Sequence, residues 1–470
     1  MKINGKLILV LLLLISAFII RIYKIDKVPA SLYIDEVDIG LQARSLLHNF
    51  KDYTNKFSPF YVHSFNDIRT PIPVYLTTIS TLVFEKQELQ IRSVSAVLGT
   101  VIVIFSFLIT RFWTNQFWAS FFVALVFATS PWQIQFSRIS HEVISMMAFL
   151  LAALYFFFKA LQNQKFVFLF LSTICLSLTV YTYRTMSLFA PLMFLLLSVI
   201  YFRQLLIFSY KKLLILIILA GALILPFLYA TTIGAPDIPR IQQLAIFNDP
   251  EVPIWVQRDR EIDSGDFQNN TIGKQASPLS FIFHSKPLSW LGFFSQNYFK
   301  VFSSEFLFLK GDPNPRHSIG KIGELFYIDI LALLAGLFYL KQNIKLNQYK
   351  FLLGWLLFAP IPAALTVDGA NHAARLFILS APLLIIIGLG WWFLFKKLKS
   401  QKYGYNMIFV LSFFWVLIFI FFLHFYFIHY PIDSARSYSF GFKQAVQKIA
   451  EIEGQYSKVV MTNLREPPLI

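Results

Sequence analysis

The sequence predicts an all-α protein that crosses a membrane many times, and two observations support that fold class. First, 57% of the 470 residues are hydrophobic and only 14% are charged, whereas soluble domains are about 45–50% apolar and about one-quarter charged. Second, apolar runs long enough to cross about 30 Å of hydrocarbon recur along the chain. The formal charge of +16 does not indicate nucleic-acid binding, because Lys and Arg gather in short segments between the apolar runs.

Eleven membrane-spanning helices are expected, at residues 7–20, 91–110, 117–133, 142–158, 166–182, 185–202, 213–230, 323–340, 351–366, 374–395 and 407–424. The shorter segment 72–84 begins among Pro71 and Pro73, and we interpret it as a re-entrant helix. If the N-terminus is cytoplasmic, six segments lie on the inner side. They contain Lys and Arg but neither Asp nor Glu, and they are 1–6, 111–116, 159–165, 203–212, 341–350 and 396–406. Counting 72–84 as a span would break this order.

The first apolar run resembles a signal peptide. It is followed by Arg21 and Lys24 in place of a small-residue cleavage site, so we expect a retained anchor. Cys175 is the single cysteine of the chain and lies in an apolar run, which excludes an internal disulfide.

Residues 1–430 are expected to form one membrane domain, with outer loops at 21–90 and 231–322, and residues 431–470 an outer tail. In the tail, FGFKQAVQKIAEIEG predicts an amphipathic helix and YSKVVMTN a strand. These two elements would begin a small α/β unit. We expect the tail either to pack on the outer loops or to be cut short.

Two adjacent carboxylates, Asp35 and Glu36, follow the first span. From Ile34 the pattern is helical, and the polar face of the predicted helix carries Asp35, Asp38, Gln42 and Asn49. We expect this amphipathic helix to lie at the membrane surface. The alternative explanation is that the carboxylates only stabilise the first turn of the helix through its dipole.

A second acidic position is Glu142, which follows His141 at the start of the fourth span. A charged residue at the end of an otherwise apolar helix is costly unless it faces a polar cavity. The alternative is a surface ion pair between Glu142 and Arg138, which would contribute little.

Cationic residues gather in the same outer segments: Arg69, Arg184, Arg240, Arg316, His317, His372 and Arg375. In VDGANHAAR, Asn371 is a fair N-cap for the tenth span, with His372 and Arg375 on one face of its first turn. A helix N-terminus beside an arginine is a ready phosphate site. The alternative is an arginine that reaches the lipid headgroups.

Several other chemistries have no support. The chain contains no GxxxxGK[ST], GxGxxG, GxSxG or HExxH motif. His424 and His429 have no acidic or Cys neighbours, so we expect interfacial histidines there. A divalent cation held by Asp35 and Glu36 with His141 or Glu142 stays an alternative that the spacing does not support.

Together these residues resemble the GT-C glycosyltransferases, in the branch of the protein O-mannosyltransferases and lipid A aminoarabinose transferases. The resemblance is carried by the Asp35–Glu36 pair, RSVSAVLGT, ATSPWQIQFSR before Glu142, GDPNPRHS and the cluster before the tenth span. It implies a GT-C-like bundle with amphipathic juxtamembrane helices in the first outer loop. It also implies a polyprenyl-phosphate sugar donor, acidic site residues at Asp35 and Glu142, and a donor-phosphate contact from Arg69 in DIRTP, where the aminoarabinose branch has Glu-Lys-Pro.

The hypothesis is a hexosyltransferase of a bacterial cytoplasmic membrane that works on the outer face, with the N-terminus inside. Asp35, with Glu36 and Glu142, would supply the catalytic carboxylates, and Asp35 would take the proton of the acceptor hydroxyl. The donor phosphate would contact Arg69, Arg316, His317, His372 and Arg375, and the substrates Arg138, His141, Arg184 and Arg240. Inversion is expected from a single displacement, and the acceptor is a lipid, a glycan or a protein. The alternatives are a flippase or transporter of lipid-linked sugar and an O-antigen-type ligase or polymerase.

Overall fold

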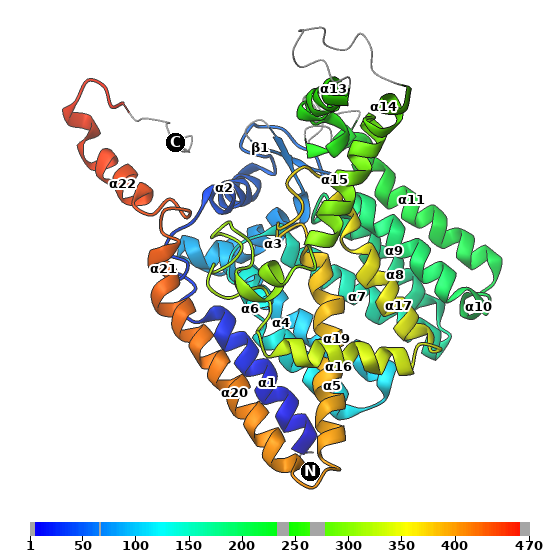
Figure 1. The fold of residues 1–470 in the computed structure, drawn as a ribbon. Coiled ribbons are helices and arrows are strands. Elements are labelled where there is room, and N and C mark those ends of the chain that lie inside the picture. Colours follow the sequence, from blue (N-terminus) through cyan, green and yellow to red (C-terminus); the bar gives the residue numbers. More distant parts are fainter. Residues whose placement is uncertain (1–4, 65–66, 233–243, 264–277, 461–470) are drawn as a thin grey trace.

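The computed structural model describes residues 5–64, 67–232, 244–263 and 278–460, which form a bundle of helices (Figure 1). Within these residues, six helices are long and apolar enough to cross a membrane, or seven if one bent pair counts as a span. Five of the six are α1 (Gly5–Ile22), α4 (Gln87–Thr114), α7 (Glu142–Asn163), α11 (Tyr210–Thr232) and α19 (Phe377–Leu398). The sixth begins with α20 (Gly404–His424) and continues to Asp433. The chain is an integral, multi-pass membrane protein.

The eleven expected spans all overlap helices, but the count of eleven is not confirmed. The bent pair is α5 (Phe117–Thr129) and α6 (Pro131–Ser137), which meet at 57°. The remaining expected spans fall on shorter helices: α8 (Phe166–Leu178) with η1 (Thr179–Tyr181), α9 (Met186–Ile200), α16 (Asp329–Gln342) and α17 (Asn347–Phe358). The segment 72–84, interpreted as re-entrant, overlaps α3 (Pro71–Thr81), which is 11 residues long.

The centre of the bundle is α19, which packs against α16, α5 and α17. Every residue from Phe377 to Trp391 is buried, and this helix therefore forms the apolar core. Two glycines let α16 and α19 approach closely. A Cβ at Gly390 would overlap the carbonyl oxygen of Ala332, and one at Gly336 would overlap that of Ile386. Small residues at helix contacts are typical of membrane bundles.

One end of the bundle carries the segments of the first outer loop. Here α2 (Ile34–Asn49) packs against α3, and a hairpin of β1 (Val62–Ser64) and β2 (Asp67–Arg69) lies beside them. The hairpin pairs Val62 with Arg69 in antiparallel register. The short helices of the second large loop stand above the bundle in Figure 1. They are η2 (Ile246–Asn248), α13 (Glu251–Asp263), α14 (Pro278–Phe283) and α15 (Lys286–Lys300).

The remaining elements are short. They are α10 (Phe202–Leu205), η3 (Glu305–Leu309), α18 (Ile361–Ala364), η4 (Phe425–His429), α21 (Tyr430–Asp433), α22 (Phe442–Ile452) and η5 (Glu453–Gln455). The expected tail helix is confirmed as α22, which points away from the bundle in Figure 1. The expected strand is wrong for Tyr456–Val460, the part of YSKVVMTN that the structure describes, because these residues form no strand. The rest of that segment lies outside the described residues.

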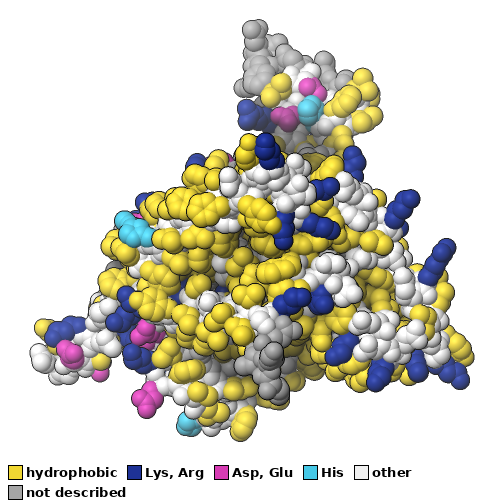
Figure 2. All heavy atoms as spheres, turned by 90° about the horizontal axis from the view of Figure 1, so that it is seen from below, with side chains coloured by type: hydrophobic (Ala, Val, Ile, Leu, Met, Phe, Trp, Pro, Cys, Tyr) yellow, Lys and Arg dark blue, Asp and Glu magenta, His cyan; other side chains and the backbone are white. Residues whose placement is uncertain are grey.

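Seen from below, the molecule presents mainly hydrophobic side chains, with Lys and Arg side chains scattered among them (Figure 2). The acidic side chains that this view shows lie toward its margins. The arrangement suits a lipid-facing bundle with basic loops. Which side faces the cytoplasm stays a prediction.

Candidate active site

One arginine joins three carboxylates at the end of the bundle. Arg69, at the end of β2, donates from Nη2 to Asp35 at 2.7 Å and from Nη1 to Glu142 at 3.1 Å. Its Nε donates to Asp38. Asp35 and Asp38 lie three residues apart on α2 and therefore share a face, while Glu142 opens α7. The sequence pointed to Asp35, Arg69 and Glu142 as site residues. It placed Asp38 on the polar face of the helix without a role in the site.

The three carboxylates differ in their access to solvent. The side chain of Asp35 is 47% exposed, that of Glu142 is 18% exposed and that of Asp38 is fully buried. Burial alone would raise the pKa of Asp35, but the charge and hydrogen bond of Arg69 outweigh it and hold that pKa below its ordinary value. The same carboxylates raise the pKa of Arg69 against the effect of burial. Asp35 is thus an ionised, accessible carboxylate beside a fixed cation.

Hydrogen bonds on both sides of the hairpin hold Arg69 in place. Ser64 donates its hydroxyl to Asp38 at 2.8 Å, and Gln42 donates to the carbonyl of His63. On the other side, Thr70 donates to the carbonyl of Thr182 at 2.9 Å. On the polar face of α2, Asp38 and Gln42 therefore contact the hairpin. That this helix lies at the membrane surface stays a prediction.

Arg184 supports the same hairpin from the loop before α9. It donates to the carbonyl of Ile68, the residue before Arg69, and its charge acts on Glu142. This position beside the carboxylates is compatible with the expected contact to substrate, which stays a prediction. Arg240 lies outside the described residues.

Glu36 has a different environment from its neighbour Asp35. It is fully buried and forms two 2.7 Å contacts with Arg92 of α4. Its carboxylate also accepts the backbone N–H of Ser140 at 2.9 Å. Arg92 in turn donates to the carbonyls of Ile25, Pro29 and Ser31. We therefore assign Glu36 a structural role and not the expected catalytic one.

The sequence contained one signal for this buried pair. Arg92 opens RSVSAVLGT inside a predicted span, and an intramembrane arginine normally has a partner. That partner, Glu36, is 56 residues away in the chain, so its identity needed the fold.

Arg138 is also structural, and its expected role in substrate binding is not supported. Its side chain is fully buried and donates to the carbonyls of Ile20, Arg21 and Val28. Its guanidinium lies 4.8 Å from the ring centroid of Phe427. The surface pair between Arg138 and Glu142 does not form, because Glu142 contacts Arg69 instead.

Three histidines lie next to one another beside this site. The ring of His317 is 5.8 Å from that of His141 and 4.8 Å from that of His372. His141 caps α7 by accepting the N–H of Val143. Burial and the neighbouring His317 lower the pKa of His141 to about 3, and burial, again with His317, lowers the pKa of His372 to about 4. Both rings are therefore neutral at pH 7 and can accept or donate hydrogen bonds.

The expected helix N-terminus at Asn371 is wrong. The helix α19 begins at Phe377 after an N-cap at Leu376, and residues 371–376 form turns. Arg375 is held by the hydroxyl of Thr366 at 2.9 Å and by Asp368, whose side chain is 59% exposed. A phosphate at Arg375 would thus be bound by its guanidinium and not by the dipole of α19.

Arg316 approaches the site from the turn that contains GDPNPRHS. Its guanidinium carbon lies 5.2 Å from the ring centroid of Tyr33, and its Nε donates to the carbonyl of Ser437 at 2.7 Å. Its charge contributes to the lowered pKa of Asp35. Arg316 is therefore close enough to Asp35 for its charge to act on that carboxylate. Its expected contact with the donor phosphate stays a prediction.

The residues named for a divalent cation do not fit one. Arg69 already lies between Asp35 and Glu142, and Glu36 is engaged by Arg92. A guanidinium at this position supplies the positive charge that a metal ion would otherwise bring.

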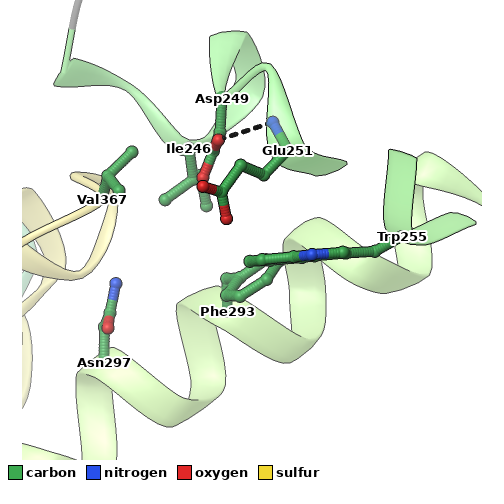
Figure 3. A pocket seen from close by; sticks show the side chains of 7 residues that line it. All are labelled: Ile246, Asp249, Glu251, Trp255, Phe293, Asn297 and Val367. Atoms are coloured by element: carbon green, nitrogen blue, oxygen red, sulfur yellow. Dashed lines mark hydrogen bonds between the residues drawn. The ribbon is translucent and has the colours of Figure 1, made fainter. Parts of the chain in front are cut away.

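A pocket of about 250 Å³ lies under the second large loop (Figure 3). The rings of Trp255 and Phe293 form one wall, and Asp249 and Glu251 lie opposite them. Val367 forms another wall. The residue before it, Thr366, accepts a hydrogen bond from Arg375. Because the paired carboxylates and arginines gather around Arg69, we place the chemistry there and not in this pocket.

Residues 68–229 match the family model described as dolichyl-phosphate-mannose-protein mannosyltransferase. The archaeal oligosaccharyltransferase AglB from Archaeoglobus fulgidus, solved with an inhibitory peptide and a dolichol-phosphate, superimposes on 99% of the chain with a TM-score of 0.54 and 15% identity. The chain has the GT-C fold. It covers 61% of the length of AglB.

Two further GT-C structures resemble the chain more weakly. ArnT from Cupriavidus metallidurans, bound to undecaprenyl phosphate, has a TM-score of 0.48 at 11% identity over 86% of the chain and 62% of its own length. The Pmt1–Pmt2 complex of S. cerevisiae, bound to the sugar donor, has a TM-score of 0.38 at 19% identity over 58% of the chain and 38% of its own length. No curated protein matches the chain.

Proposed function

We propose that this GT-C protein transfers a hexosyl group from a polyprenyl-phosphate donor to a hydroxyl group, outside the membrane and with inversion. The observation that carries the proposal is the position of Asp35. It is the most exposed of the three carboxylates around Arg69, at 47%, and it is ionised. The family match over residues 68–229, which include Arg69 and Glu142, supports the donor class.

The reaction is a single displacement at the anomeric carbon. The acceptor oxygen forms a bond to that carbon while the bond to the phosphate oxygen breaks, and the phosphate leaves with the electron pair. Asp35 takes the acceptor proton as the new bond forms. Attack opposite the leaving group inverts the anomeric configuration.

The leaving phosphate gains negative charge, which nearby cations stabilise. Arg316 lies beside Asp35, and the Asp368 partner of Arg375 is exposed enough to give way to a phosphate. Each nitrogen of Arg69 already donates to a carboxylate. A phosphate contact by Arg69 would use further N–H groups, because a guanidinium has five. We therefore give Arg69 mainly the task of fixing Asp35 and Glu142.

The position of the charged residues favours a transferase over a transporter. Glu142 is the first residue of α7, and His372 and Arg375 precede α19. Transporters place ionisable groups near the middle of the membrane. Here the charged cluster lies at one end of the helices, where a lipid phosphate and a hydroxyl acceptor can meet.

The test uses purified protein in liposomes with radiolabelled polyprenyl-phosphate sugars. Label leaving the lipid and appearing in a glycosylated acceptor would support the proposal, and Asp35→Asn should reduce that transfer by roughly 10²–10⁴-fold. Asp26→Asn is the matched control, because Asp26 pairs with Lys86 away from the site. Transfer that survives in Asp35→Asn would move the base to Glu142. Movement of intact lipid-linked sugar across the bilayer without transfer would overturn the proposal.

A further inference from the structure

The turn at GDPNPRHS and the segment before α19 bring an aspartate and two histidines together. One ligand atom from each of Asp312, His317 and His372 lies within 4.8 Å of the other two. Asp312 and His317 are buried, with side chains 4% and 10% exposed. We propose that these three residues form a binding site for a zinc ion, separate from the carboxylates around Arg69.

The ligand set suits zinc. Two imidazoles and one carboxylate are a common group of three protein ligands for Zn²⁺, at about 2.0–2.2 Å from the metal. Magnesium and calcium prefer sets of oxygen ligands. Three protein ligands leave a fourth position for water or another small ligand.

The ligands are already held by their own turns. The backbone N–H of Asn314 donates to one oxygen of Asp312 at 2.7 Å, and that of Ala373 donates to the other at 2.7 Å. Gly311 permits the turn with a φ of +76°, a conformation that other residues adopt rarely. Such contacts to a ligand fix its orientation toward a metal.

The present contacts allow a metal to enter with a small movement. Asp312 lies 2.8 Å from Nδ1 of His317, whereas two ligands of a tetrahedral zinc ion are roughly 3.4 Å apart, given the usual bond lengths. The pair must therefore open by about half an ångström, or His317 must turn its ring. The ring of His372 already faces that of His317 at 4.8 Å.

A second observation comes from the residue that precedes His372 in the chain. The side-chain oxygen of Asn371, the residue before His372, is buried and finds no donor among the described residues. A buried polar atom without a partner commonly marks an ion or a water molecule. A water molecule bound to the zinc ion would supply the missing donor.

The site also has a structural consequence. Asp312 and His317 come from the turn after η3, and His372 comes from the segment that joins α18 to α19. A shared ion would tie these two segments together. The site does not depend on the proposed transfer reaction, and its test measures the metal directly.

The experiment uses full-length, tag-free protein in detergent, stripped with chelator and then dialysed against Zn²⁺. Metal is counted by mass spectrometry, and affinity is measured by competition with a chromophoric chelator. We expect one zinc ion per chain. In His317→Gln and in His372→Gln, the affinity for zinc should fall by about a hundredfold or more. An excess of Mg²⁺ should not displace the ion.

The matched control is the double variant His424→Gln and His429→Gln. The nearest ring nitrogens of these exposed histidines lie 3.2 Å apart, so the pair offers zinc an adventitious site away from the proposed one. The control should keep its zinc ion. Retention of zinc by His317→Gln and His372→Gln, or its loss only in the control, would overturn the proposal. If a variant does not fold, the test is the absorption spectrum of the wild-type protein loaded with Co²⁺ in place of zinc. The absence of a tetrahedral cobalt spectrum would also overturn the proposal.

Discussion

Arg69 and Glu142 are 73 residues apart in the chain, and Nη1 of the arginine donates to the glutamate at 3.1 Å. This contact joins the hairpin of the first outer loop to the first residue of α7. Asp35 and Asp38 of α2 complete the cluster. Three segments thus meet at one guanidinium, and the position of the accessible carboxylate of Asp35 depends on it.

Replacement of Arg69 should damage both stability and transfer. Arg69→Met leaves Asp38 buried without its cation, a change that typically costs about 3–5 kcal/mol. Arg69→Lys keeps the charge but not the fork of N–H groups, so we expect a more stable protein with transfer still reduced at least tenfold. Unfolding in detergent and initial rates measure the two effects.

A double-mutant cycle tests whether the unpaired carboxylate of Asp38 causes the loss of stability in Arg69→Met. Adding Asp38→Asn to Arg69→Met should recover part of the lost stability, because it removes the unpaired buried charge. If the two losses simply add, the contact between Arg69 and Asp38 is not the source of the effect.

Substitutions of the neighbours Asp35 and Glu36 should have opposite effects on stability and on transfer. Glu36→Gln removes the charge partner of the fully buried Arg92, so stability should fall by about 3–5 kcal/mol while the rate per folded molecule changes little. Asp35→Asn should leave stability within about 1 kcal/mol, because its carboxylate is 47% exposed, and should abolish most transfer. A stable but inactive Glu36→Gln protein would contradict this assignment.

Much of the fold could be predicted from the sequence, because lipid requires long apolar helices with satisfied backbone groups. Every expected span falls on a helix, and the apolar pattern alone sufficed for that. Length was harder to predict. The helices α8, α9, α16 and α17 are shorter than the spans expected from their apolar runs, and α8 continues into the 3-10 helix Thr179–Tyr181.

The candidate site was predictable in composition but not in pairing. Charged residues near the ends of expected spans pointed to Asp35 and Glu142, and the family resemblance at DIRTP pointed to Arg69. Their neighbours looked similar in sequence, yet Glu36 and Arg138 are fully buried and hold the backbone. Burial depends on which helices pack together, and sequence periodicity does not contain that information.

The pH dependence of transfer tests Asp35 as the base. Arg69 holds the pKa of Asp35 below its ordinary value of 3.8, so the carboxylate is ionised throughout the neutral range. The rate should be flat on lowering the pH through about 5 and should fall only below the ordinary value, as Asp35 is protonated. Initial rates in matched buffers at constant ionic strength measure this. The control Asp26→Asn should have the same pH profile as the wild-type protein. If both proteins lose rate already above about pH 5, the proton transfer belongs to another group.

Close packing of α16 on α19 gives a prediction for the fold alone. Ala normally stabilises a helix by about 1 kcal/mol relative to Gly. At Gly390, however, the added methyl group would meet the carbonyl oxygen of Ala332, and overpacking typically costs 1–3 kcal/mol. Gly390→Ala should therefore lower the unfolding temperature. Gly292→Ala in α15 is the control, since an added methyl group there meets nothing within 4 Å, and it should leave stability unchanged or raise it. Equal behaviour of the two variants would mean that the helices do not approach as closely as described.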